Sequence, residues 1–559
     1  MPQTVQFATG QPRFRDTQAQ RLLNQGHVHA AWLAACSGRP LDALLPEVSG
    51  SFAVVITDDQ GRTWMGVDRF GVETLCYRLD GQQLRWSTRA DELGSAADGL
   101  DLQALFDYLY FHVIPSPRTI FRGVQRLPAG HCAVVDNGQA KVMRWWRPRF
   151  EESQGLDFAT AREQFLTALR GAVAACREPS RPACFLSGGT DSSTVAGMLA
   201  GLDGNKPDTY SIGFDAQGYD EMEYARLAAR HFGTTHHEYY VTPQDLVDGI
   251  PRLAAHLDQP FGNSSCLPAW CCARMAREDG VTRLLAGDGG DELYGGNARY
   301  AKQRLFSHYA QVPAALRSLL VEPAVRLPLL KHTRLFRKAE SYIEQARLPM
   351  PDRLQLYNLV MRLGPASVLS PAVLAQAGAD ASLALQREVW AGAEAPCSEL
   401  NRELAYDWRF TLAESDLPKV NAACGLAGVE VAYPMLDDAL LALSQTLPSD
   451  WKLKGQQLRW FFKEALRGFL PTEIIDKKKH GFGLPFGVWT LRHDGLRKLA
   501  TDSLHALADR GVVRRDFVEP LLGQRLAEFP GYYGEMVWIL MMLEQWLQAK
   551  VPHWRVQPT

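Results

Sequence analysis

Residues 184–195 read CFLSGGTDSSTV, which is a short apolar strand followed by a Ser/Gly turn and the start of a helix. Gly188 and Gly189 let the backbone bend sharply and approach a ligand closely. The backbone N–H groups of the turn and of the helix N-terminus converge on one point, which suits a multiply charged anion. Asp191 adds a carboxylate there, as expected where Mg²⁺ bridges a phosphate group and the protein. Further donors are the hydroxyl groups of Ser187, Ser192 and Ser193.

A second glycine-rich loop, residues 287–296, reads GDGGDELYGG and follows the apolar residues 284–286. Three acidic residues within five positions repel one another unless a cation or an amine offsets their charge. From about residue 158 helices and strands alternate. This alternation predicts a parallel, doubly wound sheet that binds ligands at the carboxyl ends of its strands. Both loops then face one crevice, where Asp191 and Asp291 can hold Mg²⁺ against pyrophosphate.

The preceding part of the chain, from about residue 45 to 145, is rich in predicted strands. Short alternating runs are separated by Asp-Gly at 80–81 and by Asn-Gly at 137–138, which are typical of tight hairpins. Beyond about residue 300 the pattern is mostly helical, and the apolar run 536–543 predicts a buried helix. The sequence therefore predicts an α/β protein with a β-rich first domain.

The composition excludes several classes of protein. A chain of 559 residues with 46% hydrophobic residues can form more than one core, and its net charge of −2 gives no basic excess for a nucleic-acid partner. Its ten cysteines include no Cys-x-x-Cys, which argues against a zinc ribbon, a redox motif or a disulfide scaffold. No apolar run is long enough to cross a bilayer, so we expect a cytoplasmic protein without a membrane partner.

Taken together, these segments resemble the asparagine synthetase family, whose synthetase domain carries an ATP-pyrophosphatase loop of the form SGGxDS. The resemblance extends from about residue 45 to about residue 550. Further matching segments are SIGF at 211–214, DE at 220–221, GTTHHE at 233–238, DQP at 258–260, YPMLD at 433–437, LP at 470–471 and KKKHGFG at 477–483.

The resemblance implies two domains. Residues 1–150 would form a degenerate domain like the class II glutamine amidotransferases, a truncated β-sandwich of the Ntn-hydrolase type. Residues 151–559 would form an asparagine synthetase-like ATP-pyrophosphatase domain. Its core would be a doubly wound parallel sheet of the adenine nucleotide alpha hydrolase type, and its C-terminal part would be helical.

The resemblance also implies roles for individual residues, with ATP and Mg²⁺ as cofactors. Mg²⁺ would be bound by Asp191 and Asp291. Asp288 would meet the attacking amine, and Lys479, within the run Lys477–Lys479, would offset the negative charge of the adenylation step. Ile212 and Gly213 would line the adenine and Gly287 the ribose. The nucleotide-binding set is then Ser187, Gly188, Gly189, Asp191, Ser192, Ser193, Ile212, Gly213 and Gly287.

The N-terminal sequence departs from the family pattern. Glutamine-dependent members begin Met-Cys-Gly, and their processed N-terminal cysteine is the glutaminase nucleophile, whereas this chain begins with Met1, Pro2 and Gln3. The first cysteine, Cys36, lies in a predicted helix and is interpreted as a core thiol. We therefore expect a glutaminase-like fold without glutaminase activity. Ammonia would come from solution or from a partner subunit, or the amine would belong to the substrate.

A second departure concerns the carboxylate acceptor. Asn421 and Ala422 stand where the family commonly has Asp-Arg, near the acceptor pocket. Loss of an arginine there removes a bidentate clamp for a carboxylate, which puts aspartate in doubt as the substrate. Free aspartate, a uronic or natural-product acid, and a peptide carboxylate all stay open as acceptors.

The predicted function is that of an ATP-dependent, AMP-forming carbon–nitrogen ligase that adenylates a carboxylate for attack by ammonia or an amine. One alternative is a macrolactam cyclase of the lasso-peptide type that acts on a precursor-peptide carboxylate, and another is a non-catalytic scaffold. A tRNA-thiolating enzyme would show cysteine pairs or a basic face, and a β-lactam synthetase would have Tyr at the position of Asp288. The expected partners are a small-molecule or peptide carboxylate, ammonia or a substrate amine, an ammonia-delivering or peptide-processing protein, and a second copy in a homodimer.

Overall fold

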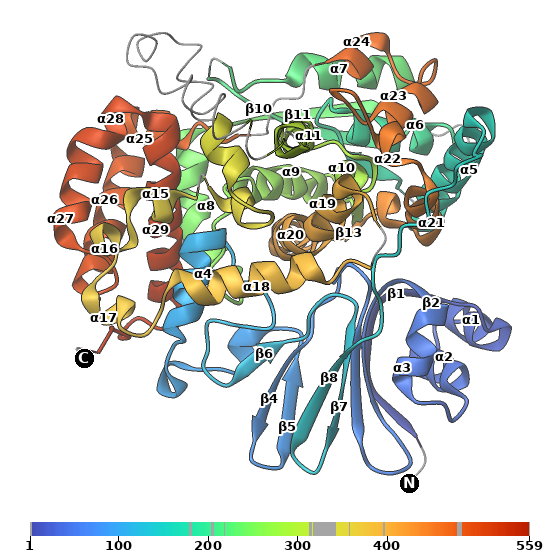
Figure 1. Ribbon diagram of the computed structural model, residues 1–559, viewed down its shortest axis with the longest axis horizontal. Coiled ribbons are helices and arrows are strands. Elements are labelled where there is room, and N and C mark those ends of the chain that lie inside the picture. The colour runs from blue at the N-terminus through green and yellow to red at the C-terminus, as the bar shows by residue number, and fades with distance from the viewer. Residues whose placement is uncertain are drawn as a thin grey trace.

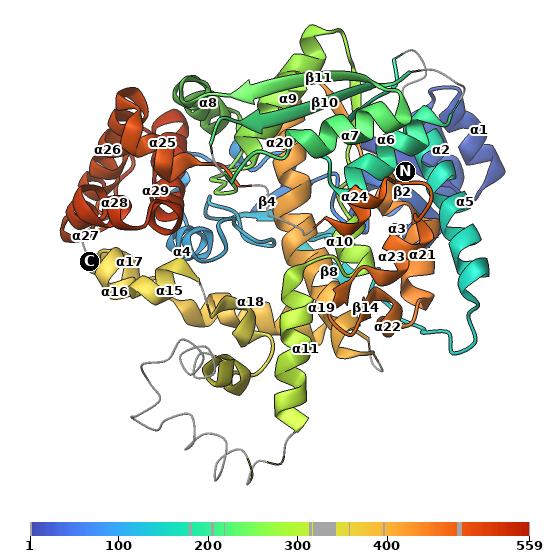
Figure 2. The same cartoon turned by 90° about the horizontal axis from the view of Figure 1, so that it is seen from above.

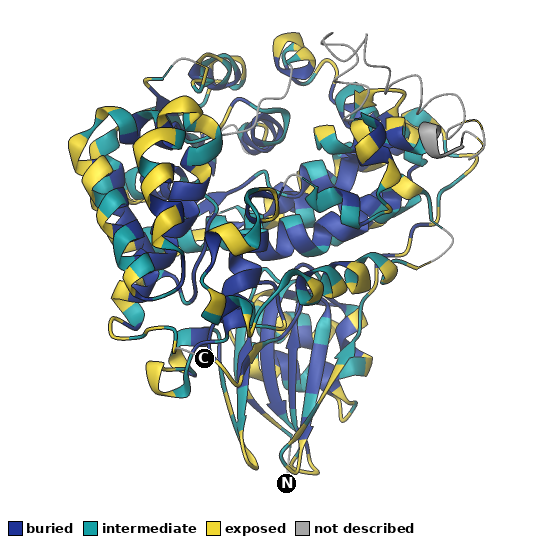
Figure 3. Cartoon of the chain, turned by 60° about the vertical axis from the view of Figure 1, so that its left-hand side comes forward, coloured by how far each residue is buried: buried dark blue, intermediate teal, exposed yellow. Residues whose placement is uncertain are grey.

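The computed structural model describes residues 3–177, 181–202, 206–216, 218–311, 313, 316, 342–356, 358–394, 397–477 and 483–557. Two sheets formed by the first 144 residues lie beneath a larger α/β part, and the last helices form a bundle at one end of that part (Figure 1). Buried residues are concentrated in the strands and in the helices packed directly on them (Figure 3). This arrangement confirms the predicted fold class, a β-sandwich followed by a doubly wound domain with a helical C-terminal part.

The N-terminal part is a sandwich of two antiparallel sheets. The larger sheet has the order β1-β2-β3-β7-β8, and the smaller one has the order β5-β4-β6. The strands of the larger sheet are β1 (Thr4–Phe14), β2 (Val48–Thr57), β3 (Thr63–Val67), β7 (His131–Asp136) and β8 (Gln139–Arg144). The smaller sheet contains β4 (Cys76–Asp80), β5 (Gln83–Ser87) and β6 (Val124–Arg126). The hairpins predicted at Asp80-Gly81 and Asn137-Gly138 are confirmed as β4–β5 and β7–β8.

Strand β1 gives no clear strand signal in the sequence, because it contains Gly10 and Pro12. Both residues are unfavourable inside a sheet, but Pro is tolerated on an edge strand, and β1 is the edge of the larger sheet. Behind β1 and β2, helix α2 (Val28–Cys36) covers the sheet with Trp32, whose ring contacts Phe52 edge-on at 5.4 Å. Cys36 is fully buried on this helix, in agreement with its interpretation as a core thiol.

The second part is built on a parallel sheet of order β11-β10-β9-β12-β13. Its strands are β9 (Ala183–Phe185), β10 (Asp208–Phe214), β11 (Thr235–Val241), β12 (Arg283–Leu285) and β13 (Glu430–Ala432). The chain moves outward from β9 in one direction and then returns to continue at β12 on its other side. The direction of winding therefore reverses between β9 and β12, and open α/β sheets bind ligands at such a switch point.

Helices complete the layers around this sheet. Helix α6 (Thr190–Ala200) follows β9, and α9 (Cys266–Glu278) packs against α20 (Leu417–Ala427) beside β10 (Figure 2). The C-terminal bundle is organised by α29 (Pro530–Lys550). This helix is buried along most of its length, as its apolar sequence predicts, and Glu544 within it pairs with Arg510 at 2.8 Å. Across the described residues, no helix has the length and apolarity needed to cross a membrane.

Candidate active site

The loop after β9 has the tight geometry expected of an anion-binding turn. Gly188 has φ +70°, and a Cβ atom there would lie 2.4 Å from the backbone nitrogen of Ala225. Gly189 is the N-cap of α6, so the first N–H groups of the helix follow it directly. The hydroxyl of Ser192 folds back on the loop and accepts a hydrogen bond from the backbone N–H of Ser187 at 3.1 Å.

The loop after β12 lies against this turn. A Cβ atom on Gly287 would be 2.9 Å from the backbone nitrogen of Ser192, and one on Gly290 would be 2.3 Å from Oδ1 of Asp191. Only glycine allows so close an approach of two backbones. Asp291 is in the first turn of the short helix α10 (Gly290–Tyr294), and the structure brings its carboxylate to the same point as that of Asp191.

A residue that the sequence did not single out, Arg459, joins the two carboxylates. Its Nη1 atom donates to Oδ2 of Asp191 and to Oδ1 of Asp291, each at 2.8 Å, and to Oγ1 of Thr190 at 2.9 Å. Burial lowers the pKa of Arg459, but the carboxylates of Asp191 and Asp291 outweigh it and the net shift is upward. The two predicted Mg²⁺ ligands thus already converge on one cationic group.

A cavity of about 470 Å³ opens beside these loops at the carboxyl end of the sheet. Its apolar side is formed by residues of β9, β10 and α9, and its polar side carries Asp288, Asp416 and Lys419. Ile212 and Gly287, which were predicted to line the adenine and the ribose, both line this cavity. The apolar lining residues include Phe185, Leu186, Tyr210, Ile212, Met222, Ala269 and Cys272.

Lys419, at the start of α20, connects the acids of the cavity. Its Nζ atom is 3.5 Å from Oδ1 of Asp288 and 3.0 Å from Oδ1 of Asp416. Burial raises the pKa of Asp288, and the Lys419 ammonium opposes that rise. Burial also lowers the pKa of Lys419, but the charges of Asp416 and Asp288 outweigh it, so Lys419 stays protonated. A largely buried carboxylate beside an ammonium group is suited to accept a proton from an amine.

A second cavity of about 610 Å³ adjoins the other side of the Ser187–Ser192 turn. Besides Arg459 it is lined by Lys463 on α23 (Trp460–Ala465) and by Lys477, which pairs with Glu221 at 2.9 Å. Burial, together with the positive charge of Arg459, lowers the pKa of Lys463. This concentration of cations beside a loop of N–H and hydroxyl donors suits a polyphosphate.

Two of the sequence-predicted residues, Ser193 and Gly213, do not line either cavity. Ser193 is fully buried, and its hydroxyl has no hydrogen-bond partner among the described residues. Gly213 faces the side chains of Asp220 and Tyr240, and a Cβ atom on it would lie 2.8 Å from each of them. Lys479 is outside the described residues. The remaining predicted residues line one or both of the two cavities or, as with Gly188, set the path of the turn.

The donors present fit Mg²⁺ and a nucleotide. The two loops direct two carboxylates, those of Asp191 and Asp291, at one cationic group. Mg²⁺ typically binds one or two carboxylates and completes its coordination shell with phosphate oxygens and water, so this arrangement suits it. Within the described ranges no cluster of three or more His, Cys, Asp or Glu side chains could hold a metal without such a ligand. Asp191 and Asp291 would hold the ion, and the Ser187–Ser192 turn would hold the phosphates.

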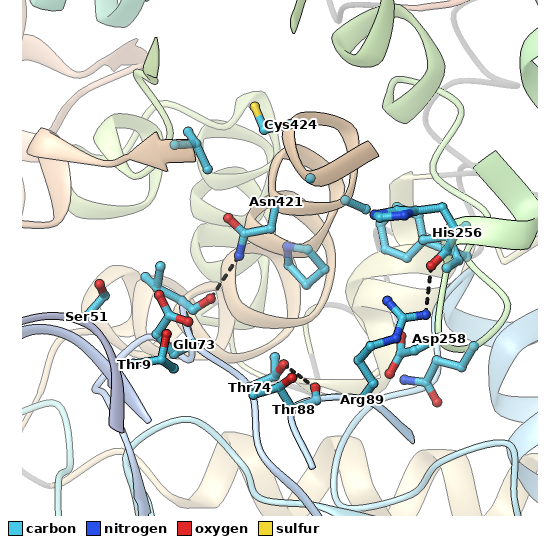
Figure 4. Close-up of a pocket in the computed structure, with 18 of the residues that line it drawn as sticks. Thr9, Ser51, Glu73, Thr74, Thr88, Arg89, His256, Asp258, Asn421 and Cys424 are labelled. Atoms are coloured by element: carbon cyan, nitrogen blue, oxygen red, sulfur yellow. Dashed lines mark hydrogen bonds between the residues drawn. The ribbon is translucent and has the colours of Figure 1, made fainter. Parts of the chain in front are cut away.

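A third cavity, of about 620 Å³, lies between the N-terminal sandwich and the α/β part (Figure 4). Helix α20 separates it from the cavity of Asp288, because Asn421 and Cys424 line this side whereas Lys419 lines the other. Asn421 donates to the carbonyl oxygen of Val72 at 2.8 Å and accepts from the Tyr433 hydroxyl at 2.7 Å. The side chain of Asn421, the first residue of the pair that replaces Asp-Arg, is thus directed at the N-terminal sandwich.

The cysteines of the N-terminal sandwich are buried thiols. Burial raises the pKa of Cys36 to about 11 and that of Cys132 to about 12, and it raises the pKa of Cys76 further. A nucleophilic cysteine requires the thiolate form, which such environments disfavour.

Comparison with protein families decides the assignment. A family model described as "Asparagine synthase" matches residues 164–548, which is well over half of the chain. The chain belongs to the asparagine synthase family. A second model, described as "Glutamine amidotransferase domain", matches residues 33–146. Both matches confirm the resemblance expected from the motifs.

Individual relatives agree with this assignment. Asparagine synthetase [glutamine-hydrolyzing] 1 of Bacillus subtilis is 21% identical over 89% of this chain and 77% of its own length. A putative asparagine synthetase of Mycobacterium bovis is 27% identical over 70% of this chain and 59% of its own length. For a putative asparagine synthetase of Methanocaldococcus jannaschii the identity is 30%, over 48% of this chain and 54% of that protein. The chain thus spans between half and about three-quarters of these relatives.

Proposed function

We propose that this member of the asparagine synthase family is an ATP-dependent carbon–nitrogen ligase. It adenylates a carboxylate with release of pyrophosphate and then forms an amide with ammonia or an amine. The observation that carries the proposal is the meeting of Asp191 and Asp291 at the switch point of the parallel sheet, with Asp288 in the adjoining cavity. A scaffold protein has no need of such an arrangement.

Each of the two reaction steps uses one of two cavities, the one that contains Asp288 and the one lined by Arg459 and Lys463. In the first step a carboxylate oxygen of the acceptor attacks the α-phosphorus of ATP, and pyrophosphate leaves toward the turn, Arg459 and Lys463. Mg²⁺ between Asp191 and Asp291 would neutralise the charge of the leaving group. In the second step the amine attacks the acyl carbon, AMP leaves, and the carboxylate of Asp288 accepts the proton that the amine loses. The ammonium group of Lys419, 3.5 Å away, favours the ionised form of that carboxylate.

The nitrogen source is proposed to be ammonia or a substrate amine and not glutamine hydrolysed by this chain. The buried cysteines of the amidotransferase-like region support this, because none of Cys36, Cys76 and Cys132 has an environment that favours a thiolate. The acceptor is a small-molecule or peptide carboxylate. Ala422, which stands where the family commonly has an arginine, has no group that could clamp the second carboxylate of aspartate.

Mass spectrometry tests the proposal. The full chain is incubated with ATP, Mg²⁺ and ammonium or a primary amine, and with aspartate, uronic acids or a peptide as the carboxylate. We expect AMP in an amount equal to that of one amide product. Full activity with glutamine in place of ammonium, in the absence of another protein, would overturn the proposal on the nitrogen source. Release of ADP in place of AMP would overturn the proposed adenylation.

A further inference from the structure

Arg459 occupies a position that the proposed reaction assigns to a metal ion. Its side chain is 6% exposed and forms ion pairs with both Asp191 and Asp291. These two residues lie on loops that follow different strands, β9 and β12, and Arg459 comes from a third segment, just before α23. One guanidinium group therefore ties together the two loops that form the site.

The backbone conformation of Arg459 and its neighbouring residues hold the guanidinium group in this position. Its backbone has φ +57°, a left-handed conformation that is unfavourable for a residue with a side chain and persists where neighbouring contacts enforce it. A Cβ atom on Gly296 would lie 2.6 Å from Cδ of Arg459 and would collide with Oδ1 of Asp291. The guanidinium also lies 4.2 Å from the ring centre of Phe462, a favourable cation–π contact.

Charge balance limits what can share this site. One guanidinium group does not neutralise two carboxylates completely, but it occupies carboxylate oxygens that a divalent cation needs as ligands. A metal ion that entered while Arg459 stayed in place would also be repelled by the buried guanidinium group. A polyphosphate changes this balance, because its oxygen atoms can accept the hydrogen bonds that Arg459 gives up.

We propose that Arg459 competes with the divalent cation for Asp191 and Asp291, so that the metal binds strongly only together with a polyphosphate that takes over the guanidinium group. The inference rests on the metal clamp of the proposed function and deepens it. Metal and polyphosphate then each raise the affinity of the protein for the other by the same factor, as linkage requires. This competition prevents the two carboxylates from binding a metal ion in the absence of a nucleotide.

Binding of Mn²⁺, measured on the full chain by electron paramagnetic resonance, tests this competition without any turnover. Without polyphosphate, wild type should bind Mn²⁺ weakly and Arg459→Gln at least about tenfold more tightly, as expected for removal of a competing charge pair. Inorganic pyrophosphate should tighten Mn²⁺ binding to wild type by at least about tenfold and should tighten binding to the variant much less. Equal Mn²⁺ affinities of wild type and Arg459→Gln would overturn the inference.

Two further variants make the result decisive. Arg459→Lys keeps the positive charge but cannot donate to both carboxylates in a fork, so its Mn²⁺ affinity should lie between those of wild type and Arg459→Gln. It replaces Arg459→Gln if that variant does not fold, and an affinity equal to that of wild type would then overturn the inference. Arg39→Gln is the matched control, because the Arg39 guanidinium is held by Glu47 at 2.9 Å in the N-terminal part and lines neither cavity, and it should bind Mn²⁺ as wild type does.

The outcome separates this inference from the proposed function. Mn²⁺ binding involves neither a carboxylate acceptor nor an amine. Carboxylate-dependent pyrophosphate exchange with no coupling between Mn²⁺ and pyrophosphate refutes only the role of Arg459. Coupling without exchange for any carboxylate refutes the proposed ligase and leaves the role of Arg459 standing.

Discussion

The Nζ atom of Lys419 lies 3.5 Å from Oδ1 of Asp288, on the polar side of the cavity that also contains Ile212. Burial raises the pKa of Asp288 above its ordinary value, and the ammonium group of Lys419 opposes that rise. In the proposed reaction Asp288 must be ionised to accept a proton from the amine. In the proposed reaction, this pair therefore influences the acid limb of the pH profile of amide formation.

Lys419→Met removes this charge. The pKa of Asp288 then rises further, so the acid limb of the pH profile of amide formation should move upward by about 1 pH unit or more. Lys498→Met, which removes an exposed lysine paired with Asp502, is the control and should keep the wild-type profile. The profile is measured as kcat/KM for the amine. An unchanged acid limb in Lys419→Met would show that Asp288 is not the proton acceptor.

Gly188→Ala tests the conformation of the Ser187–Ser192 turn. Alanine at φ +70°, with its Cβ atom 2.4 Å from the Ala225 nitrogen, should destabilise the protein by about 1–3 kcal/mol, measured by denaturant unfolding. Gly189→Ala is the matched control, since its nearest contact is Ser187 Oγ at 3.4 Å and its φ is −80°. Gly189→Ala should retain nearly all the stability of wild type. Similar losses in both variants would contradict the close approach seen at Gly188.

Glu73, in the cavity between the sandwich and the α/β part, makes stability depend on pH. Burial, with Asp68 and Glu430 nearby, raises its pKa from 4.5 to about 7. The folded state binds the Glu73 proton more tightly than the unfolded state does. The resulting stabilisation of the folded protein is complete below pH 4.5 and is lost as the pH rises through about 7. Above that pH Glu73→Gln should be more stable than wild type, by up to about 3 kcal/mol.

Unfolding by urea at pH 4.5 and at pH 8 measures this difference. Glu73→Gln should match wild type at the lower pH and exceed it at the higher one. The exposed Glu163 on α5 (Phe158–Cys176) provides the control variant Glu163→Gln, which should follow wild type at both. A constant difference at the two pH values would show that Glu73 titrates normally.

Much of the fold could be predicted because its signals are local. The strand, the Ser/Gly turn and the helix around residue 187 are contiguous in sequence, and so are the hairpins at Asp80-Gly81 and Asn137-Gly138. Strand β13 has three residues and lies within a helical region, so it gives no periodic signal. It nevertheless completes the parallel sheet beside β12.

The site was less predictable, because its key contacts join distant segments. Arg459 is 268 positions from Asp191, and no local pattern marks it as different from other arginines. The direction of Asn421 depends on the orientation of α20, which is set by packing against α9 and not by the sequence of the helix alone. Lys419, by contrast, has a weak local signal, since it follows Asp416 at a helical spacing of three.

Carboxylate-dependent exchange between ATP and labelled pyrophosphate tests the central claim most directly, because adenylation precedes and does not require the amine. In the presence of Mg²⁺, one class of carboxylate should support exchange by the wild-type chain. Asp191→Asn, confirmed as folded by its thermal unfolding, should reduce that exchange by at least about 100-fold. No exchange with any amino-acid, uronic or peptide carboxylate, or undiminished exchange in Asp191→Asn, would contradict the account.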